Sequence, residues 1–317
     1  MVLLGIELGG VSQHWRSATV ICLVTFGLLF TGLFAIYESY TAKYPIISPA
    51  TFRDRASIAA YALSFLHAFT FMGGCYWLPL YYQTVMSATS LRSGLYLLPL
   101  VLSLGTTVVA AGIIIKRTGN YRIPIITTFF LLTLGFGLFT GLGHPTSWAK
   151  VIIFQIIAGC GIGPNFQALL VSLQANVEPS EIGSATCTIA FLRQIGSAVS
   201  IVVGGVIFNN EMQNQHEGLA KLIGPSLAGV YGSENAAAAA HQVRDLPTAD
   251  RAVVAHAYWK ALQKTFIAYA CCSFTGFCVS FLVEQKTLKE IHAEHKTGLA
   301  SLKRRCEIKA LPADHEI

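Results

Sequence analysis

The sequence places one strongly basic side chain, Arg193, inside the apolar stretch 184–208. At a rise of ~1.5 Å per residue, it lies roughly nine residues, or ~14 Å, from one end of a helix there. Insertion scales put the cost of a cation at such a depth at about 2.5 to 3.5 kcal/mol, so Arg193 needs a partner. Small or weakly polar residues share its helical face, which indicates a helix contact or a water-filled cavity: Ala190, Gly196, Ser197, Ser200 and Gly204. Two roles stay open for Arg193, namely ligand binding or gating, and tethering to backbone carbonyls of neighbouring helices.

A second polar series recurs at every fourth residue of the stretch 151–173: Gln155, Gly159, Gly163 and Gln167. Pro164 removes a backbone N–H beside Gly163 and predicts a bend, a feature that forms gates and ligand sites in membrane proteins. The amides of Gln155, Asn165 and Gln167 are candidates for ligand contacts or for hydrogen bonds between helices. For Gly159 and Gly163, as for Gly196 and Gly204, we expect close helix packing.

The stretch 58–80 and the residues after it add His67, Tyr82 and Gln83. His67 lies near the middle of the stretch, where an imidazole that titrates near neutrality could carry protons; a neutral histidine bonded within the core is the alternative. Tyr82 and Gln83 belong to an aromatic run at the end of the stretch. An aromatic belt at the membrane interface explains these rings without any ligand, and contact with a ligand is the second interpretation.

No residue set in these stretches supports catalysis or metal binding. The stretches hold no Asp or Glu at depth, so no nucleophile, base and acid can be assembled within them. The eight cysteines include no C-x-x-C pair, and seven of them fall within apolar stretches as small apolar residues. We therefore expect no enzyme, no metal site and no organic cofactor.

The elements that must position these residues are long apolar helices. Of the 317 residues, 53% are hydrophobic and 12% charged, whereas soluble domains carry about 25% charged residues. Seven stretches approach the ~20 residues that a helix needs to cross ~30 Å of hydrocarbon: 17–37, 58–80, 94–115, 123–142, 151–173, 184–208 and 265–283. Barrel strands are excluded because they would be about ten residues long and would alternate. The fold class is therefore an all-α, polytopic transmembrane helix bundle.

Lys and Arg side chains predict the orientation of these helices. They concentrate after the first stretch, after the third and in the tail 284–317, which places these segments in the cytoplasm and the N-terminus outside. The interval 209–264, with weakly helical pieces, is then extracellular. The net charge of +6 follows largely from this asymmetry, so we expect a lipid bilayer and no nucleic acid as partner. Residues 1–10 lack the basic start and the cleavage site of a signal peptide.

Five groups of residues occur in an order typical of one family: Leu8-Gly9-Gly10 with His14-Trp15-Arg16-Ser17, then Tyr76 to Gln83, Ser93-Gly94 with Leu97-Leu98-Pro99, Gly159, Gly161 and Gly163 with Gln167, and Phe191, Arg193, Gly196 and Gly204-Gly205. Together they cover nearly the whole chain. The sequence resembles the major facilitator superfamily and, within it, the fourteen-span drug:proton antiporter branch that is common in fungi.

The turn after the third stretch resembles the cytoplasmic signature loop of that superfamily, which reads Gly, three residues, Asp, Arg, one residue, Gly and then a basic pair. The matching residues here are Gly112, Lys116, Arg117, Gly119 and Arg122. Lys116 stands where the family has its acid. The resemblance implies charge contacts with neighbouring helix ends that help to lock one conformational state, and a generic basic turn is the alternative.

The resemblance implies the C-terminal half of a transporter. Residues 1–57 would form an outer segment, a linker span and a cytoplasmic loop, residues 58–283 a six-span bundle, and residues 284–317 a cytoplasmic tail. The implied activity is proton-coupled efflux of small metabolites, toxins or drugs, such as fungal secondary metabolites, across the cell (plasma) membrane, with the proton gradient as energy source.

Two kinds of partner follow from this resemblance. One is a small-molecule substrate, and the other is a missing N-terminal half or another copy of the chain. The alternative function is a half-transporter without transport activity of its own, either inert or acting as a membrane interaction protein.

Overall fold

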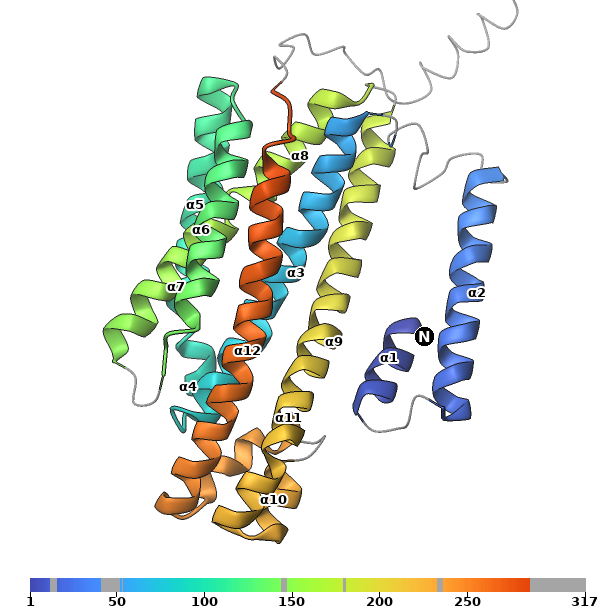
Figure 1. The fold of residues 1–317 in the computed structure, drawn as a ribbon. Coiled ribbons are helices and arrows are strands. Elements are labelled where there is room, and N and C mark those ends of the chain that lie inside the picture. Colours follow the sequence, from blue (N-terminus) through green and yellow to red (C-terminus); the bar gives the residue numbers. More distant parts are fainter. Residues whose placement is uncertain are drawn as a thin grey trace, which may run out of the picture. The chain divides into compact units, whose positions relative to one another are not determined.

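The computed structural model describes residues 1–11, 16–40, 52, 54–143, 147–178, 181–232 and 236–285. Throughout these ranges the regular elements are helices, without any strand (Figure 1). The predicted all-α fold class is therefore confirmed. Of the expected tail 284–317, the residues from 286 onward lie outside the described part, as do His14 and Trp15.

Six stretches of helix in the described part are long and apolar enough to cross a membrane, judged by length and composition. They are α2 (Ala18–Tyr40), α3 (Arg55–Thr84), α4 (Ser90–Leu95) with α5 (Leu98–Thr118), α6 (Arg122–Phe139), α7 (Trp148–Ile162) with α8 (Asn165–Asn176), and α9 (Ile182–Ile223). A short helix, α1 (Val2–Val11), precedes them and packs on α2 and α9. Six of the seven predicted spans are thus helices suited to a membrane.

The seventh predicted span, 265–283, lies in α12 (Thr248–Ser280). This helix is long enough to cross a membrane but does not belong to the six, because polar residues such as Gln263 and Lys264 stand just before its apolar part. It runs beside α3 and α9 and packs against both, as well as against α6 (Figure 1). Its place in the bundle is therefore fixed by helix packing.

The predicted bend beside Pro164 is present as a break between two helices. Helix α7 ends at Ile162, α8 begins at Asn165, and Gly163 and Pro164 connect them. Because proline has no N–H to donate, the ladder of backbone hydrogen bonds cannot continue through this position.

The interval 209–264 is more helical than the sequence predicts. Helix α9 continues without interruption to Ile223, and α10 (Pro225–Tyr231), α11 (Ala236–Ala239) and the 3₁₀ turn η3 (Ala240–Asp245) follow before α12. Beyond residue 208 the composition of α9 becomes polar, but Met212, Leu219 and Ile223 remain buried. They recur at steps close to whole helical turns, so one face stays packed while the other meets water. The fall in hydropathy therefore marks the end of the apolar segment, and the helix goes on.

A buried hydrogen-bonded group fastens three long helices together. The Tyr269 hydroxyl of α12 donates to the backbone oxygen of Ser200 in α9 at 2.7 Å, and the Trp77 indole of α3 donates to that hydroxyl at 3.1 Å. The Ser200 hydroxyl lies 2.6 Å from the backbone oxygen of Phe69 in α3. These contacts hold α3, α9 and α12 in one register.

Candidate functional site

The break between α7 and α8 leaves the Ile162 carbonyl without the backbone donor of a continuous helix. In a continuous helix the Phe166 N–H would bond to Ile162, but here it donates to the Gly163 oxygen at 3.1 Å. The Nε2 atom of His67, on α3, lies 2.8 Å from the Ile162 oxygen. A carbonyl only accepts, so Nε2 carries the proton in this contact. His67 is only 1% exposed, and it thus joins α3 to the broken helix.

Arg193 reaches the same break from α9. One of its terminal nitrogens donates to the backbone oxygens of Asn165 at 3.2 Å and of Phe166 at 3.3 Å. Its guanidinium carbon lies 5.4 Å from the centre of the Phe166 ring, and that ring also meets His67 edge-on at 5.1 Å. Arg193, Asn165, Phe166 and His67 therefore form one group, which we call the break cluster. These are the contacts that a tether between helices would make.

The charge of Arg193 has no acidic counterpart in the described ranges. The ion pair recorded there joins Lys264 to Glu211 at 2.6 Å, in the region of α9 and α12 beyond the apolar segments. The Nε atom of Arg193 also lacks a hydrogen-bond partner. A positive charge held among helices without a carboxylate can attract an anionic or electron-rich group of a ligand.

Two buried side-chain amides, one at the break and one further back in α7, have no hydrogen-bond partner. Gln155 of α7 and Asn165 of α8 are both 0% exposed. The oxygen and the nitrogen of each side-chain amide are unpaired. Buried polar groups without partners are rare in native proteins and mark a strained or functional position, or a site for water. Gln155 and Asn165 are therefore the strongest ligand-binding candidates, whereas Gln167 is exposed.

Tyr82 and Gln83 lie elsewhere, at the end of α3. Tyr82 is 0% exposed, its ring meets the Tyr96 ring edge-on at 5.7 Å, and its hydroxyl has no hydrogen-bond partner. Gln83 is half-buried, donates to the Ser93 hydroxyl at 3.5 Å, and lines a small pocket of about 310 Å³ together with residues of α11. Of the aromatic run, Tyr76 is exposed, but Trp77 and Tyr82 are buried. Those two rings pack in the core and do not face lipid as an aromatic belt would.

The packing glycines lie where helices approach most closely. A Cβ added to Gly159 or Gly163 would meet backbone of α5, at 2.5 Å from the Leu100 oxygen and 2.6 Å from the Leu104 oxygen. A Cβ added to Gly196 would lie 2.6 Å from the Phe65 oxygen of α3, and one at Gly204 would collide with Trp77 and Tyr269. The absence of a side chain thus allows α7 to approach α5, and α9 to approach α3.

The family model described as Major Facilitator Superfamily matches residues 1–201 of this chain. The chain belongs to the Major Facilitator Superfamily. Members are membrane transporters and not enzymes, so the chain belongs to a family of multi-pass membrane transport proteins, as the sequence predicted.

Named relatives in fungi agree with this assignment. The chain is 40% identical over 301 residues to the MFS-type transporter ppz2 of Metarhizium majus, covering 95% of this chain and 52% of the relative. It is 38% identical over 304 residues to the efflux pump dotC of Dothistroma septosporum, covering 96% and 52%. It is 29% identical over 292 residues to the efflux pump FUS6 of Gibberella fujikuroi, covering 91% and 52%. The chain spans about half the length of the curated relatives it matches.

The loop that resembles the superfamily's signature connects α5 to α6. Gly119 adopts φ +66°, which favours glycine, and its N–H closes α5 by donating to Ile115 at 2.8 Å. Lys116 and Arg117 are exposed, and an added Cβ at Gly112 would meet open space. Arg122 donates to the backbone oxygen of Phe281, just after α12, at 3.2 Å.

The strongest contact of this superfamily loop comes from a residue that the sequence did not single out. The Gln285 side chain donates to the Gly119 oxygen at 2.8 Å and accepts the backbone N–H groups of Tyr121 and Arg122, each at 3.2 Å. The Tyr121 hydroxyl donates to the Glu284 oxygen at 2.9 Å. Among the described residues, the loop is thus joined to the end of α12 by these hydrogen bonds and by the one from the Arg122 guanidinium. No signal in the sequence marks Gln285, because its partners are backbone groups.

Proposed function

We propose that this transporter exports small metabolites, toxins or drugs from the cell in exchange for protons, and that it does so in the plasma membrane. Two relatives of similar coverage are named efflux pumps, which supports the direction of transport. The observation that carries a site for the substrate is that each part of the broken helix holds a buried, unpaired amide, Gln155 in α7 and Asn165 in α8. Broken helices at mid-membrane are a recurring form of transporter sites.

Each member of the site has a role in this proposal. Gln155 and Asn165 supply a donor and an acceptor to polar groups of an otherwise apolar substrate. Arg193 holds the first turn of α8 and adds a positive charge beside it. His67 donates a hydrogen bond to the Ile162 oxygen on the other side of the break, so the proton on its Nε2 atom is held in that contact. Because the described spans offer these groups without a nearby carboxylate partner for Arg193, we place the proton-coupling acid outside the break cluster.

The test is export from an efflux-deficient yeast that expresses the chain as it stands. Accumulation of a panel of fluorescent and toxic compounds is measured with and without a proton uncoupler. We expect uncoupler-sensitive export that Gln155→Leu and Asn165→Leu abolish, because each removes an unpaired donor and acceptor while leaving a side chain of similar size. Gln167→Leu serves as the matched control, because Gln167 is exposed. Export unchanged in both site variants would contradict the proposed substrate site.

The second candidate is a half-transporter that needs another helical bundle. One face of α5 carries large apolar side chains that no described residue covers, with Leu102 64% and Val109 62% exposed. Lipid or another bundle must cover such a face in a membrane. Correctly inserted protein that exports nothing by itself, but exports when co-expressed with the N-terminal half of a relative, would favour this alternative over the first.

A further inference from the structure

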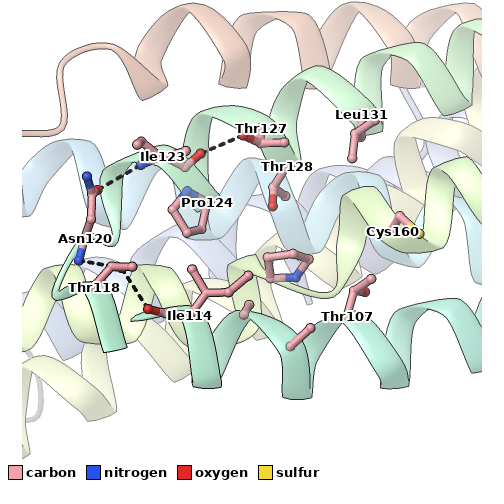
Figure 2. A pocket seen from close by; sticks show the side chains of 13 residues that line it. Thr107, Ile114, Thr118, Asn120, Ile123, Pro124, Thr127, Thr128, Leu131 and Cys160 are labelled. Atoms are coloured by element: carbon pink, nitrogen blue, oxygen red, sulfur yellow. Dashed lines mark hydrogen bonds between the residues drawn. The ribbon is translucent and has the colours of Figure 1, made fainter. Parts of the chain in front are cut away.

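A cavity of about 500 Å³ lies between α5 and α6 (Figure 2). Its lining is mainly apolar and includes Ala110, Ile114 and Leu131, while its inner end reaches Cys160 and Pro164 at the break between α7 and α8. None of the sequence-predicted substrate residues lines it. Its size falls in the range of about 300 to 1,000 Å³ that is typical of small-molecule sites.

One hydroxyl in this cavity is unpaired. Thr107, Thr118 and Thr127 each bond to a backbone oxygen of their own helix, at 2.7, 2.7 and 2.9 Å. Thr128 is 0% exposed and its hydroxyl has no hydrogen-bond partner, although its side chain points into the cavity (Figure 2). A buried hydroxyl without an acceptor is costly, so an occupant that supplies an acceptor at this depth would be favoured.

The cavity lining holds no charged residue, but basic residues neighbour one of its ends. One end lies at the loop between α5 and α6, where Asn120 belongs to the lining and the exposed Lys116 and Arg117 form the last turn of α5. The lining contains no acidic residue. Thr128 follows Arg122, the first residue of α6, by six positions, or ~9 Å at ~1.5 Å per residue. From the loop inward, the order is thus positive charge beside the cavity, then one unpaired hydrogen-bond donor in its wall, then a mainly apolar lining.

An anionic phospholipid carries complementary groups in the same order, namely a phosphate, ester carbonyls and acyl chains. We propose that the cavity binds one anionic phospholipid from the leaflet on the side of this loop. The phosphate lies near Arg117, an ester carbonyl accepts the hydroxyl of Thr128, and one acyl chain follows Ile114 toward Pro164. Lys and Arg side chains close to the membrane surface attract such anionic headgroups.

The test is native mass spectrometry of the purified full chain with dioleoyl phosphatidylglycerol or dioleoyl phosphatidylcholine. Wild-type protein should retain the anionic lipid preferentially. Arg117→Gln should lower that preference about fivefold, the factor expected from one basic residue beside an anionic headgroup. Arg92→Gln, at another exposed basic residue, is the matched control and should leave the preference unchanged.

Two further variants test the cavity itself. Ala110→Phe fills the cavity and Thr128→Val removes the unpaired donor at constant size, and both should lower retention of both lipids severalfold. Leu102→Phe, on the same helix but outside the lining, should not. Thermal unfolding of every variant separates loss of lipid from loss of fold.

Unchanged retention in folded Ala110→Phe and unchanged preference in Arg117→Gln would overturn the proposal. Tighter binding of dodecanol than of phosphatidylglycerol to the wild type would also overturn it, because the cavity would then serve neutral amphiphiles.

Discussion

Arg193 shows how a guanidinium can be kept among membrane helices without an acidic partner. One terminal nitrogen of its guanidinium donates to two backbone oxygens at the start of α8, and the guanidinium lies over the ring of Phe166. Arginine suits this place because its planar, delocalised charge stacks on aromatic rings and is weakly hydrated. The hydrogen bonds and the stacking offset part of the insertion cost and leave the charge available for a ligand.

The contacts of Arg193 lead to a first prediction. Arg193→Lys keeps the charge but loses the stacking over Phe166 and replaces the nitrogen that donates to both carbonyls by a more strongly hydrated ammonium. It should therefore lower the stability of the folded protein by about 1.5 to 3 kcal/mol, as expected for hydrogen bonds to a charged group. Thermal unfolding in detergent measures this, with the exposed neighbour variant Gln194→Ala as control. A stable Arg193→Lys protein that no longer exports would instead assign Arg193 to the substrate.

At this scale the sequence identified most members of the break cluster but not their partners. Arg193, Asn165 and His67 stand out because polar residues are rare in apolar stretches. What they contact is largely backbone, such as the Ile162 oxygen that the break makes available. A backbone carbonyl has no sequence signature, and neither does the geometry that frees it. Phe166 was not singled out either, because phenylalanine is common in apolar helices and marks no site.

Helices in this bundle approach one another through glycines, and the contact of α9 with α3 offers a matched pair of glycines to test this. A Cβ at Gly196 would lie 2.6 Å from a backbone oxygen of α3, which cannot move aside as a side chain could. By contrast, a Cβ at Gly205 of the same helix would meet open space. The two positions therefore differ in surroundings while sharing a helix.

We expect Gly196→Ala to destabilise the folded protein by about 1 to 3 kcal/mol, the usual cost of overpacking. Gly205→Ala should be neutral or stabilise it by up to about 1 kcal/mol, since alanine favours helix more than glycine does. Thermal unfolding of the two variants side by side checks this. Equal stabilities would show that α9 and α3 are not held at this distance.

Element positions were largely predictable, whereas element ends were not. Long apolar stretches identified the spans because the membrane demands them. The end of α9 was missed because helix formation beyond residue 208 depends on packing of Met212, Leu219 and Ile223, and this packing follows the fold of later segments. Polar composition and helical structure are compatible wherever one face remains buried.

For the whole molecule, the positions of the basic residues predict which side of the membrane each loop faces. Helix packing alone does not define this orientation. The loop between α5 and α6 should lie in the cytoplasm, and the helices α10, α11 and η3 outside. If so, the phospholipid cavity opens toward the cytoplasmic leaflet, and the pocket beside Gln83 toward the exterior. The orientation therefore decides which leaflet and which solution each site meets.

Glycosylation mapping in yeast measures this orientation with two designed acceptor sequences. Lys116→Asn completes an Asn-x-Thr sequon with Thr118 at the loop, and Gln242→Asn with Arg244→Thr creates one in η3; all three substituted residues are exposed. We expect the η3 sequon to be glycosylated, seen as slower gel mobility that an endoglycosidase reverses, and the loop sequon to stay unmodified, because basic flanks are retained on the cytoplasmic side. The opposite result would show that the bundle has the reverse orientation. The cavity would then open to the outer leaflet, and the direction of the proposed transport past the same residues would be reversed.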